Sequence, residues 1–405
     1  MSRPDEASIR VPTPGRRCTR VLPFLVALSA SIIPLRGLTA QDSSTAQNSE
    51  HLLATRLDRI VSDPALIRAH VGLAVQVAET GDVLYENEAE KRFVPASNTK
   101  IVTAAVALDA LPPRFRWTTR IVADGPVHDG TLQGDLWIIG GGDPVLSRSD
   151  VAGWTAILNK AGIKRIDGDI IGDDRVFEDG QWGDGWMWND VYGGWATGIS
   201  GLQLHPNTVR AYLIPGATLG DETRMELRGG GPDLPIENRV LTGAPGSEVR
   251  LDFLPPPEGG DVRLEGWVPL GPDTVPLYLA TPHPTLYMLD YLGDLLQREG
   301  IEVSGETRRA GPTDRPSAPS WSTELHSEPL STVVTKMLKP SDNQIAETVL
   351  RTIGREAGDG GSVESGLEVV RETLATWGIE PGAVSLSDGS GLSRYNELTP
   401  NAMVR

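Results

Sequence analysis

Residues 94–108 read VPASNTKIVTAAVAL, and this stretch decides both the expected fold and the expected chemistry. The run from Ile101 to Leu108 is apolar and rich in alanine, which is typical of a helix that packs into a core. Ser97 and Lys100 lie three residues apart at its start, so their side chains can touch on one face of the helix. The stretch therefore predicts a buried helix with a serine and a lysine on its first turn.

This pair of residues suits nucleophilic catalysis. A serine hydroxyl attacks poorly unless a base beside it removes its proton. A lysine amine ordinarily has a pKa of ~10.4, and burial against an apolar wall can lower that pKa to ~7–8, where the neutral amine accepts a proton. The apolar face after Lys100 could supply this burial. The simpler alternative is that Ser97 caps the helix and Lys100 remains in water.

A second stretch, SDNQIAETVL at 341–350, places Ser341 and Asn343 at the start of another expected helix. Ser341 could relay a proton between Lys100 and a leaving amine, and Asn343 could bind the amide of a substrate. Of the six lysines in the chain, only Lys100 follows a serine by three residues. The alternative is an ordinary N-cap formed by Ser341 or by Asp342.

Composition narrows the class of protein. The formal net charge of the 405 residues is −17, and such a surface repels phosphate backbones, which argues against a nucleic-acid partner. The six histidines show no metal-ligand spacing, so no metal site is expected. No run of 18 apolar residues occurs, so no membrane-spanning segment is expected.

The N-terminus is predicted to be a signal peptide that covers residues 1–40. A basic region with Arg16, Arg17 and Arg20 precedes the short apolar segment VLPFLVALSASIIP, and a plausible cleavage site follows Ala40. Cys18, the only cysteine, would leave with this segment, so the mature protein would contain no disulfide. Export to the periplasm or cell envelope is therefore expected, and a buried N-terminal helix is the alternative.

Three segments are expected after residue 40. Residues 41–113 form the first part of an α/β domain, beginning with a polar stretch at 41–50 that is expected to be mobile. Residues 114–277 are rich in glycine, proline and short β-branched runs, which predicts a mostly β insertion with two subdomains. Residues 278–405 return to helices and form the second part of the domain. The pattern predicts helices at 52–69, 150–161, 283–299, 330–338, 342–357 and 363–377, and a hairpin around 79–81.

Ser-x-x-Lys at 97–100 followed by Ser-x-Asn at 341–343 resembles the penicillin-binding protein and serine β-lactamase superfamily. The serines lie 244 residues apart, which is too far for a simple β-lactamase and is similar to class C low-molecular-mass penicillin-binding proteins, the D-alanyl-D-alanine carboxypeptidase/endopeptidase group. GDLWIIGGGDPVL and SDGSGLSRYNELTP are similar to stretches of the same group. The resemblance implies an α/β (α+β) transpeptidase/β-lactamase-like domain with an antiparallel sheet and helices, split by the insertion.

The resemblance also implies a role for each residue of the two motifs. Ser97 would be the acyl-enzyme nucleophile and Lys100 its general base. Ser341 would be the proton shuttle, and Asn343 would contact the substrate amide. The implied reaction needs no cofactor: it hydrolyses D-Ala-D-Ala or cross-link bonds of peptidoglycan stem peptides, and β-lactams such as penicillins inhibit it.

Two further residues are candidates for substrate binding. Arg394, in SDGSGLSR, matches a family position near the peptide side chain of the substrate, where an arginine suits a carboxylate. A structural salt bridge is the alternative for Arg394. Trp195 belongs to an aromatic cluster that, by the resemblance, approaches the cleft; the alternative is that this cluster forms the core of a small domain.

One feature departs from the pattern of the family. The superfamily carries a third motif, Lys or His, then Thr or Ser, then Gly, and this chain has no such triplet. The chain ends 11 residues after Arg394, from which we expect that the C-terminal strands of the sheet are missing and that the domain is truncated. A second hypothesis is therefore a non-catalytic, peptidoglycan-binding remnant of the family. A β-lactamase ranks third, because no stretch clearly supplies the extra base for fast deacylation.

Overall fold

The computed structural model describes residues 41–228, 236–254 and 262–405. The expected signal peptide at 1–40, which includes Cys18, lies outside the described residues. Within the described part of the chain, no helix is both long and apolar enough to cross a membrane.

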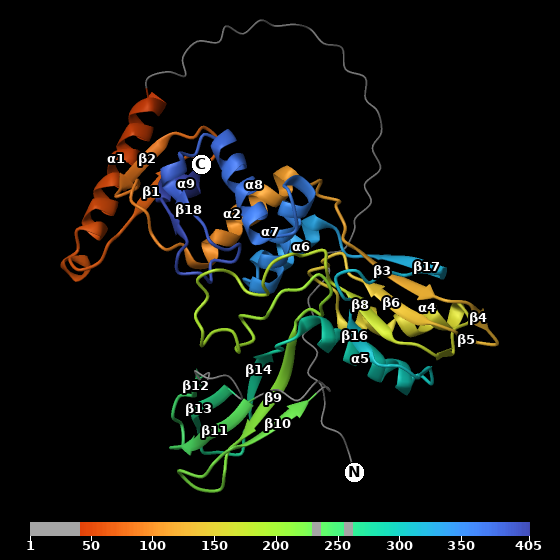
Figure 1. Ribbon diagram of the computed structural model, residues 1–405. Helices are drawn as coiled ribbons and strands as arrows, with labels where there is room; N and C mark the ends of the chain where they lie inside the picture. Colours follow the sequence, from red (N-terminus) through yellow and green to blue (C-terminus); the bar gives the residue numbers. More distant parts are fainter. Residues whose placement is uncertain (1–40, 229–235, 255–261) are drawn as a thin grey trace, which may run out of the picture. The chain divides into compact units, whose positions relative to one another are not determined.

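Helix α1 (Gln41–Val61) is the first described element (Figure 1). The chain divides into two compact units between Arg56 and Leu57, and this helix contains residues of both units. The polar stretch 41–50 was expected to be mobile but belongs to this helix, because polar residues without glycine or proline can still be helical. The helix ends at Val61, earlier than expected, since Pro64 starts a separate 3₁₀ turn.

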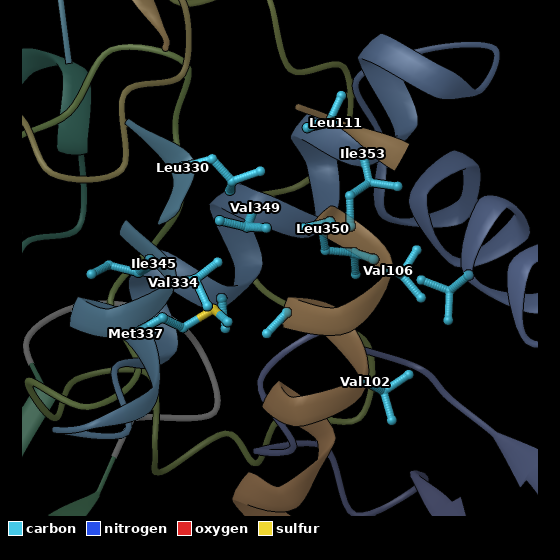
Figure 2. Close-up of a cluster of buried hydrophobic side chains, with 14 of the residues drawn as sticks. Val102, Val106, Leu111, Leu330, Val334, Met337, Ile345, Val349, Leu350 and Ile353 are labelled. Carbon is cyan, nitrogen blue, oxygen red and sulfur yellow. The ribbon is translucent and has the colours of Figure 1, made fainter. Parts of the chain in front are cut away.

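Four helices surround the core that supports the Ser97 segment. Their apolar residues recur every three or four positions, so each helix buries one face against the others. Figure 2 shows Val106 of the first helix together with Val349, Leu350 and Ile353, and all four side chains are fully buried. The helices predicted at 330–338, 342–357 and 363–377 are confirmed to within one residue. The four are α2 (Thr99–Ala110), α6 (Leu330–Leu338), α7 (Asn343–Ala357) and α8 (Val363–Thr376).

Short strands pair near this helical core. The predicted hairpin around residues 79–81 is confirmed as an antiparallel pair, and Gly81 takes a φ of +74° in its turn, which glycine adopts without steric cost. Thr399 accepts a hydrogen bond from Ala402 N–H and so caps the last helix. The elements are β1 (Leu73–Gln76), β2 (Val83–Asn87), β18 (Val384–Ser385), β19 (Glu397–Leu398) and α9 (Pro400–Val404).

The middle of the chain builds a five-stranded sheet and a four-stranded sheet. The five-stranded sheet is mixed, since its pairs β6–β8 and β8–β16 are parallel whereas β3 pairs antiparallel with β6 and β17. Its strands, in order across the sheet, are β16 (Thr307–Arg309), β8 (Ile170–Asp173), β6 (Asp135–Ile139), β3 (Thr118–Asp124) and β17 (Pro319–His326). Those of the four-stranded sheet are β15 (Glu302–Val303), β7 (Arg165–Ile166), β5 (Thr131–Leu132) and β4 (Val127–His128).

Three helices accompany these sheets, and apolar residues from sheets and helices form one core. The helix predicted at 150–161 is in fact two helices that meet at Gly153, whose N–H group bonds to the Ser149 and Asp150 carbonyls in a tightened last turn. The helix predicted at 283–299 is confirmed. The helices are α3 (Arg148–Ala152), α4 (Trp154–Lys160) and α5 (Pro284–Arg298).

Two three-stranded sheets form a second, smaller β unit with its own core, which includes Leu213, Val240 and Leu264. Its first sheet contains β10 (Arg224–Arg228), β9 (Thr208–Ile214) and β14 (Val275–Ala280). The second contains β11 (Ile236–Gly243), β13 (Val262–Pro269) and β12 (Arg250–Leu254).

Strand pairing does not follow the expected boundary at residue 277. Strands β15, β16 and β17 lie after that residue, yet they pair with β7, β8 and β3. Helix α5 also contributes to the core of these sheets. The sequence does not reveal this because partner strands can lie far apart in the chain. The division into 41–113, 114–277 and 278–405 otherwise stays a prediction.

Candidate active site

Ser97 lies in a 3₁₀ turn, η2 (Ala96–Asn98), that leads directly into helix α2. Its side chain is exposed, whereas the next residues of the helix are buried. Ala96 has a φ of +47°, a conformation that costs energy for any residue other than glycine and that often occurs at functional sites. The turn thus presents the Ser97 hydroxyl at the surface above a buried helix.

Lys100 is almost fully buried, with 1% of its surface exposed. Its Nζ lies 3.3 Å from Ser97 Oγ, 2.5 Å from Asn343 Oδ1 and 2.6 Å from the Ser390 carbonyl oxygen. An ammonium group has three protons, so these three contacts account for all of its donors. The predicted proximity of Ser97, Lys100 and Asn343 is therefore present in the structure.

Burial lowers the pKa of Lys100 from its ordinary value. The negative charges of Asp388, Glu347 and Asp342 act in the opposite direction, because they stabilise the ammonium form. Burial has the larger effect, so the balance favours the neutral amine more than in an exposed lysine.

Asn343 is the first residue of helix α7 and joins two parts of the site. Its Oδ1 accepts the bond from Lys100, and its Nδ2 donates to the Trp195 carbonyl oxygen at 2.8 Å. Its side chain therefore orients the lysine and fixes the Trp195 backbone beside it.

Ser341 lies two residues before Asn343 and is exposed, with a φ of +62°. Among the described residues, its hydroxyl has no hydrogen-bond partner, so the structure does not bring it into contact with Lys100 as the relay role would require. The capping alternative for Ser341 is excluded, since Asp342 is the N-cap of α7 and accepts from Ile345 N–H at 2.9 Å. Burial acts to raise the pKa of Asp342, but its contact with His205 Nε2 at 2.9 Å, the bond from Ile345 N–H and the charge of Lys100 together lower that pKa below its ordinary value.

Trp195 and Arg394 lie near the site but do not touch Lys100. The Trp195 side chain is half-exposed, and its indole Nε1 donates to Asp190 Oδ1 at 3.4 Å. Arg394 is exposed, and its Nε lies 3.0 Å from the sulfur of Met187. Within the described part of the chain Arg394 forms no ion pair, so the salt-bridge alternative is not supported. Arg394 also lines a hollow of about 850 Å³ with Trp186, Met187, Trp188, Arg250 and Tyr395.

The loop 387–396 carries a buried aspartate that the sequence did not single out. Asp388 accepts from the Gly391 and Ser393 N–H groups at 2.7 and 2.8 Å, and from Asn396 Nδ2 at 2.6 Å. Trp186 Nε1 also donates to it, at 2.9 Å. Asp-Gly pairs favour such turns, but the sequence does not show that this turn closes over the start of helix α2.

Gly391 explains why this loop can approach the Ser97 turn so closely. It takes a φ of +81°, and a Cβ atom built there would lie 1.8 Å from the Ala96 carbonyl oxygen. A side chain at this position would therefore push the loop away from the turn.

A buried ion pair on α7 was also missed. Glu347 and Arg351 are fully buried, and their closest charged atoms lie 3.4 Å apart. Burial and the charge of Asp388 raise the pKa of Glu347 to about 7, although Arg351 opposes this change. The sequence signal for this pair is an acidic and a basic residue four positions apart on a helix with an apolar face. Exposed ion pairs have the same spacing, so the spacing does not reveal that this pair is buried.

Comparisons with known proteins show the family. The model of the D-Ala-D-Ala carboxypeptidase 3 (S13) family matches residues 53–405. The chain belongs to this family. The assignment confirms the resemblance to low-molecular-mass penicillin-binding proteins and the enzyme class that the resemblance implied.

Individual relatives agree with this assignment. The chain is similar to a D-alanyl-D-alanine carboxypeptidase of Actinomadura sp. (strain R39), at 29% identity over 97% of this chain and 74% of the relative. The D-alanyl-D-alanine carboxypeptidase DacB of Haemophilus influenzae is 27% identical over 83% of this chain and 70% of its own. A crystal structure of penicillin binding protein 4 from H. influenzae matches with a TM-score of 0.72 at 26% identity, covering 82% of this chain and 73% of that one. The mixed α/β fold is therefore that of a penicillin-recognising peptidase.

Proposed function

We propose that this protein is a serine DD-carboxypeptidase/DD-endopeptidase that hydrolyses D-Ala-D-Ala or cross-link bonds of peptidoglycan stem peptides through an acyl-enzyme on Ser97. The observation that carries the proposal is the contact of the buried Lys100 amine with the exposed Ser97 hydroxyl. The named relatives, which are D-alanyl-D-alanine carboxypeptidases, support the reaction class. They do not favour the alternative of a non-catalytic, peptidoglycan-binding remnant.

The contacts of Lys100 support a defined proton path. A neutral amine has two N–H groups and one lone pair. If the two N–H groups donate to Asn343 and Ser390, the lone pair faces Ser97, whose hydroxyl then donates to it. The amine takes this proton as Ser97 Oγ attacks the carbonyl carbon of the substrate, and the proton then passes to the leaving amine. Water hydrolyses the ester and regenerates the hydroxyl.

The remaining predicted residues take roles around this centre. Ser341, which is exposed two residues before Asn343, would relay the proton to the leaving amine when substrate is bound. Asn343 would contact the substrate amide, and Trp195 would line the substrate-binding groove. Arg394 would bind a carboxylate of the stem peptide. Peptidoglycan as substrate fits a protein exported to the periplasm or cell envelope, and β-lactams would acylate Ser97 as inhibitors.

Labelling with a fluorescent penicillin tests this function. The wild-type chain should form a covalent adduct, and mass spectrometry should place that adduct on Ser97. Ser97→Ala should remove the label, whereas Ser331→Ala, which changes an exposed serine on α6, should keep it. Release of D-alanine from a stem peptide should follow the same pattern. A wild-type chain that stays unlabelled, or a label that persists in Ser97→Ala, would contradict the proposal.

A further inference from the structure

Helix α7 faces Lys100 with two residues one turn apart. Asn343 contacts the amine directly, and Glu347 reaches it through the loop 387–396. Glu347 Oε1 accepts hydrogen bonds from the N–H groups of Gly389 and Ser390, at 2.9 and 2.8 Å. The carbonyl of the same Ser390 accepts from Lys100 Nζ at 2.6 Å. One residue of the loop therefore connects the carboxylate to the amine.

We propose that Glu347 is a positioning residue for Lys100: it holds the Ser390 carbonyl against the amine, and its charge sets how readily the amine loses its proton. This inference rests on the function proposed above, in which Lys100 is the general base for Ser97. Glu347 is fully buried, so it contacts neither Ser97 nor a bound substrate. Its role acts through Ser390 and through the electric field at Lys100.

The loop is clamped from both sides at the point where Glu347 holds it. Thr103, on the same helix as Lys100, donates its hydroxyl to the Gly389 carbonyl at 2.7 Å. Residue Gly389 is thus bound by α2 through its carbonyl and by α7 through its N–H group. A carboxylate that accepts two adjacent N–H groups fixes the orientation of the peptide between them. The Ser390 carbonyl belongs to the next peptide, whose Gly391 N–H donates to Asp388 at 2.7 Å. Glu347, which holds the Ser390 N–H, and Asp388 therefore together limit the movement of this carbonyl away from Lys100.

The charges around Glu347 define the direction of its effect on Lys100. Arg351 on α7 and Asp388 of the loop face it, and Asp179 binds the far side of Arg351 at 2.9 Å. Lys100 on α2 feels the negative charges of Glu347 and Asp388, and that of Asp342. A charged Glu347 stabilises the ammonium form and so raises the pKa of Lys100. Removing the charge should make the neutral base available at lower pH.

Two substitutions separate the charge from the geometry. Glu347→Gln keeps an acceptor oxygen but removes the charge, so the acidic limb of the acylation rate against pH should move down by about 0.5 to 1 pH unit. Glu347→Asp keeps the charge but is one methylene shorter, so the Ser390 carbonyl loses its support. Its maximal acylation rate should fall about tenfold or more. The rates are measured with a chromogenic or fluorescent penicillin.

A control on the same helix and a stability measurement complete the test. Glu356→Gln changes an exposed carboxylate of α7 and should leave the pH profile unchanged. Thermal unfolding shows which variants fold.

A Glu347→Gln profile that coincides with the wild-type profile would overturn the charge effect. If Glu347→Gln does not fold, Glu347→Asp decides, and an unchanged maximal rate overturns the proposal. If neither variant folds, Glu347 is a structural residue and the proposal is wrong. An unlabelled wild-type chain would instead refute the proposed function.

Discussion

Asp174, beside the five-stranded sheet, and Glu347, in the helical core, are both buried carboxylates with an arginine partner. Asp174 accepts from the hydroxyls of Ser200 and Thr285, and its arginine, Arg309, is more than half exposed to water. Arg351, the partner of Glu347, is fully buried, and the other acceptor oxygen of Glu347 holds the loop next to Lys100.

The difference between the two clusters lies in what they contain besides the ion pair. The Asp174 cluster contains hydroxyl groups that cannot change charge near neutral pH. Its role is to supply hydrogen bonds to the buried Asp174 carboxylate. The Glu347 cluster lies against an amine whose pKa is lowered by burial. Perturbed titratable groups that meet in this way are typical of functional sites, whereas satisfied pairs are typical of structure.

The largest effect expected from this difference concerns Lys100. Lys100→Met should lower the rate of acylation by about 10³-fold, because no base remains to take the Ser97 proton. Arg309→Met, in the other cluster, should change that rate less than about twofold, since it lies outside the proton path. Stopped-flow acylation by a penicillin measures both, and similar losses in the two variants would remove the distinction between the clusters.

The pH dependence of stability should also distinguish the clusters. The pKa of Glu347 is raised from its ordinary 4.5 to about 7, so the folded state binds a proton that the unfolded state has lost. The free energy of unfolding should therefore fall by about 1–3 kcal/mol as pH rises from about 4.5 to about 7. Urea unfolding at several pH values should show this slope in the wild type and a weaker one in Glu347→Gln. Equal slopes would show that Glu347 does not titrate in this range.

Asp174→Asn should have a smaller effect, and on stability alone. The neutral amide keeps one acceptor for the hydroxyls but loses the ion pair with Arg309, at a cost of about 2 kcal/mol. Urea unfolding measures the loss, and the acylation profile against pH should remain that of the wild type. A shifted profile would mean that this cluster also influences the proton path.

Two helix caps give the smallest expected effect. Asp342 caps α7 at the site, and Ser362 caps α8 away from it by accepting from Ser365 N–H. Replacing either by alanine should cost about 1 kcal/mol of stability. Only Asp342→Ala should also change the acylation profile, because Asp342 contributes to the field at Lys100. If both variants acylate like the wild type, the carboxylates around Lys100 matter less than its burial.

Local patterns predicted much of the site. The spacing of Ser97 and Lys100 placed both on one helical turn, and SDNQ placed Asn343 at the start of a second helix, so their contact followed once the two helices packed together. The helices α6, α7 and α8 were predicted well because their apolar periodicity is regular.

Contacts between distant segments could not be predicted in this way. Asp388 and Glu347 gain their roles only when the loop 387–396 closes between α2 and α7, and no local pattern shows that closure. The partners of β15, β16 and β17 are hidden for the same reason. The break at Gly153 was missed because the pattern on both sides of it is helical.

The central claim is that burial lowers the pKa of Lys100 below that of an ordinary lysine, so that its amine can act as the base for Ser97. The chain has only six lysines, so an NMR titration of lysine labelled with ¹³C at Cε can follow each one. The resonance that disappears in Lys100→Met identifies Lys100. This resonance should titrate below the ordinary lysine pKa of ~10.4. Titration at or above that ordinary value would contradict the claim.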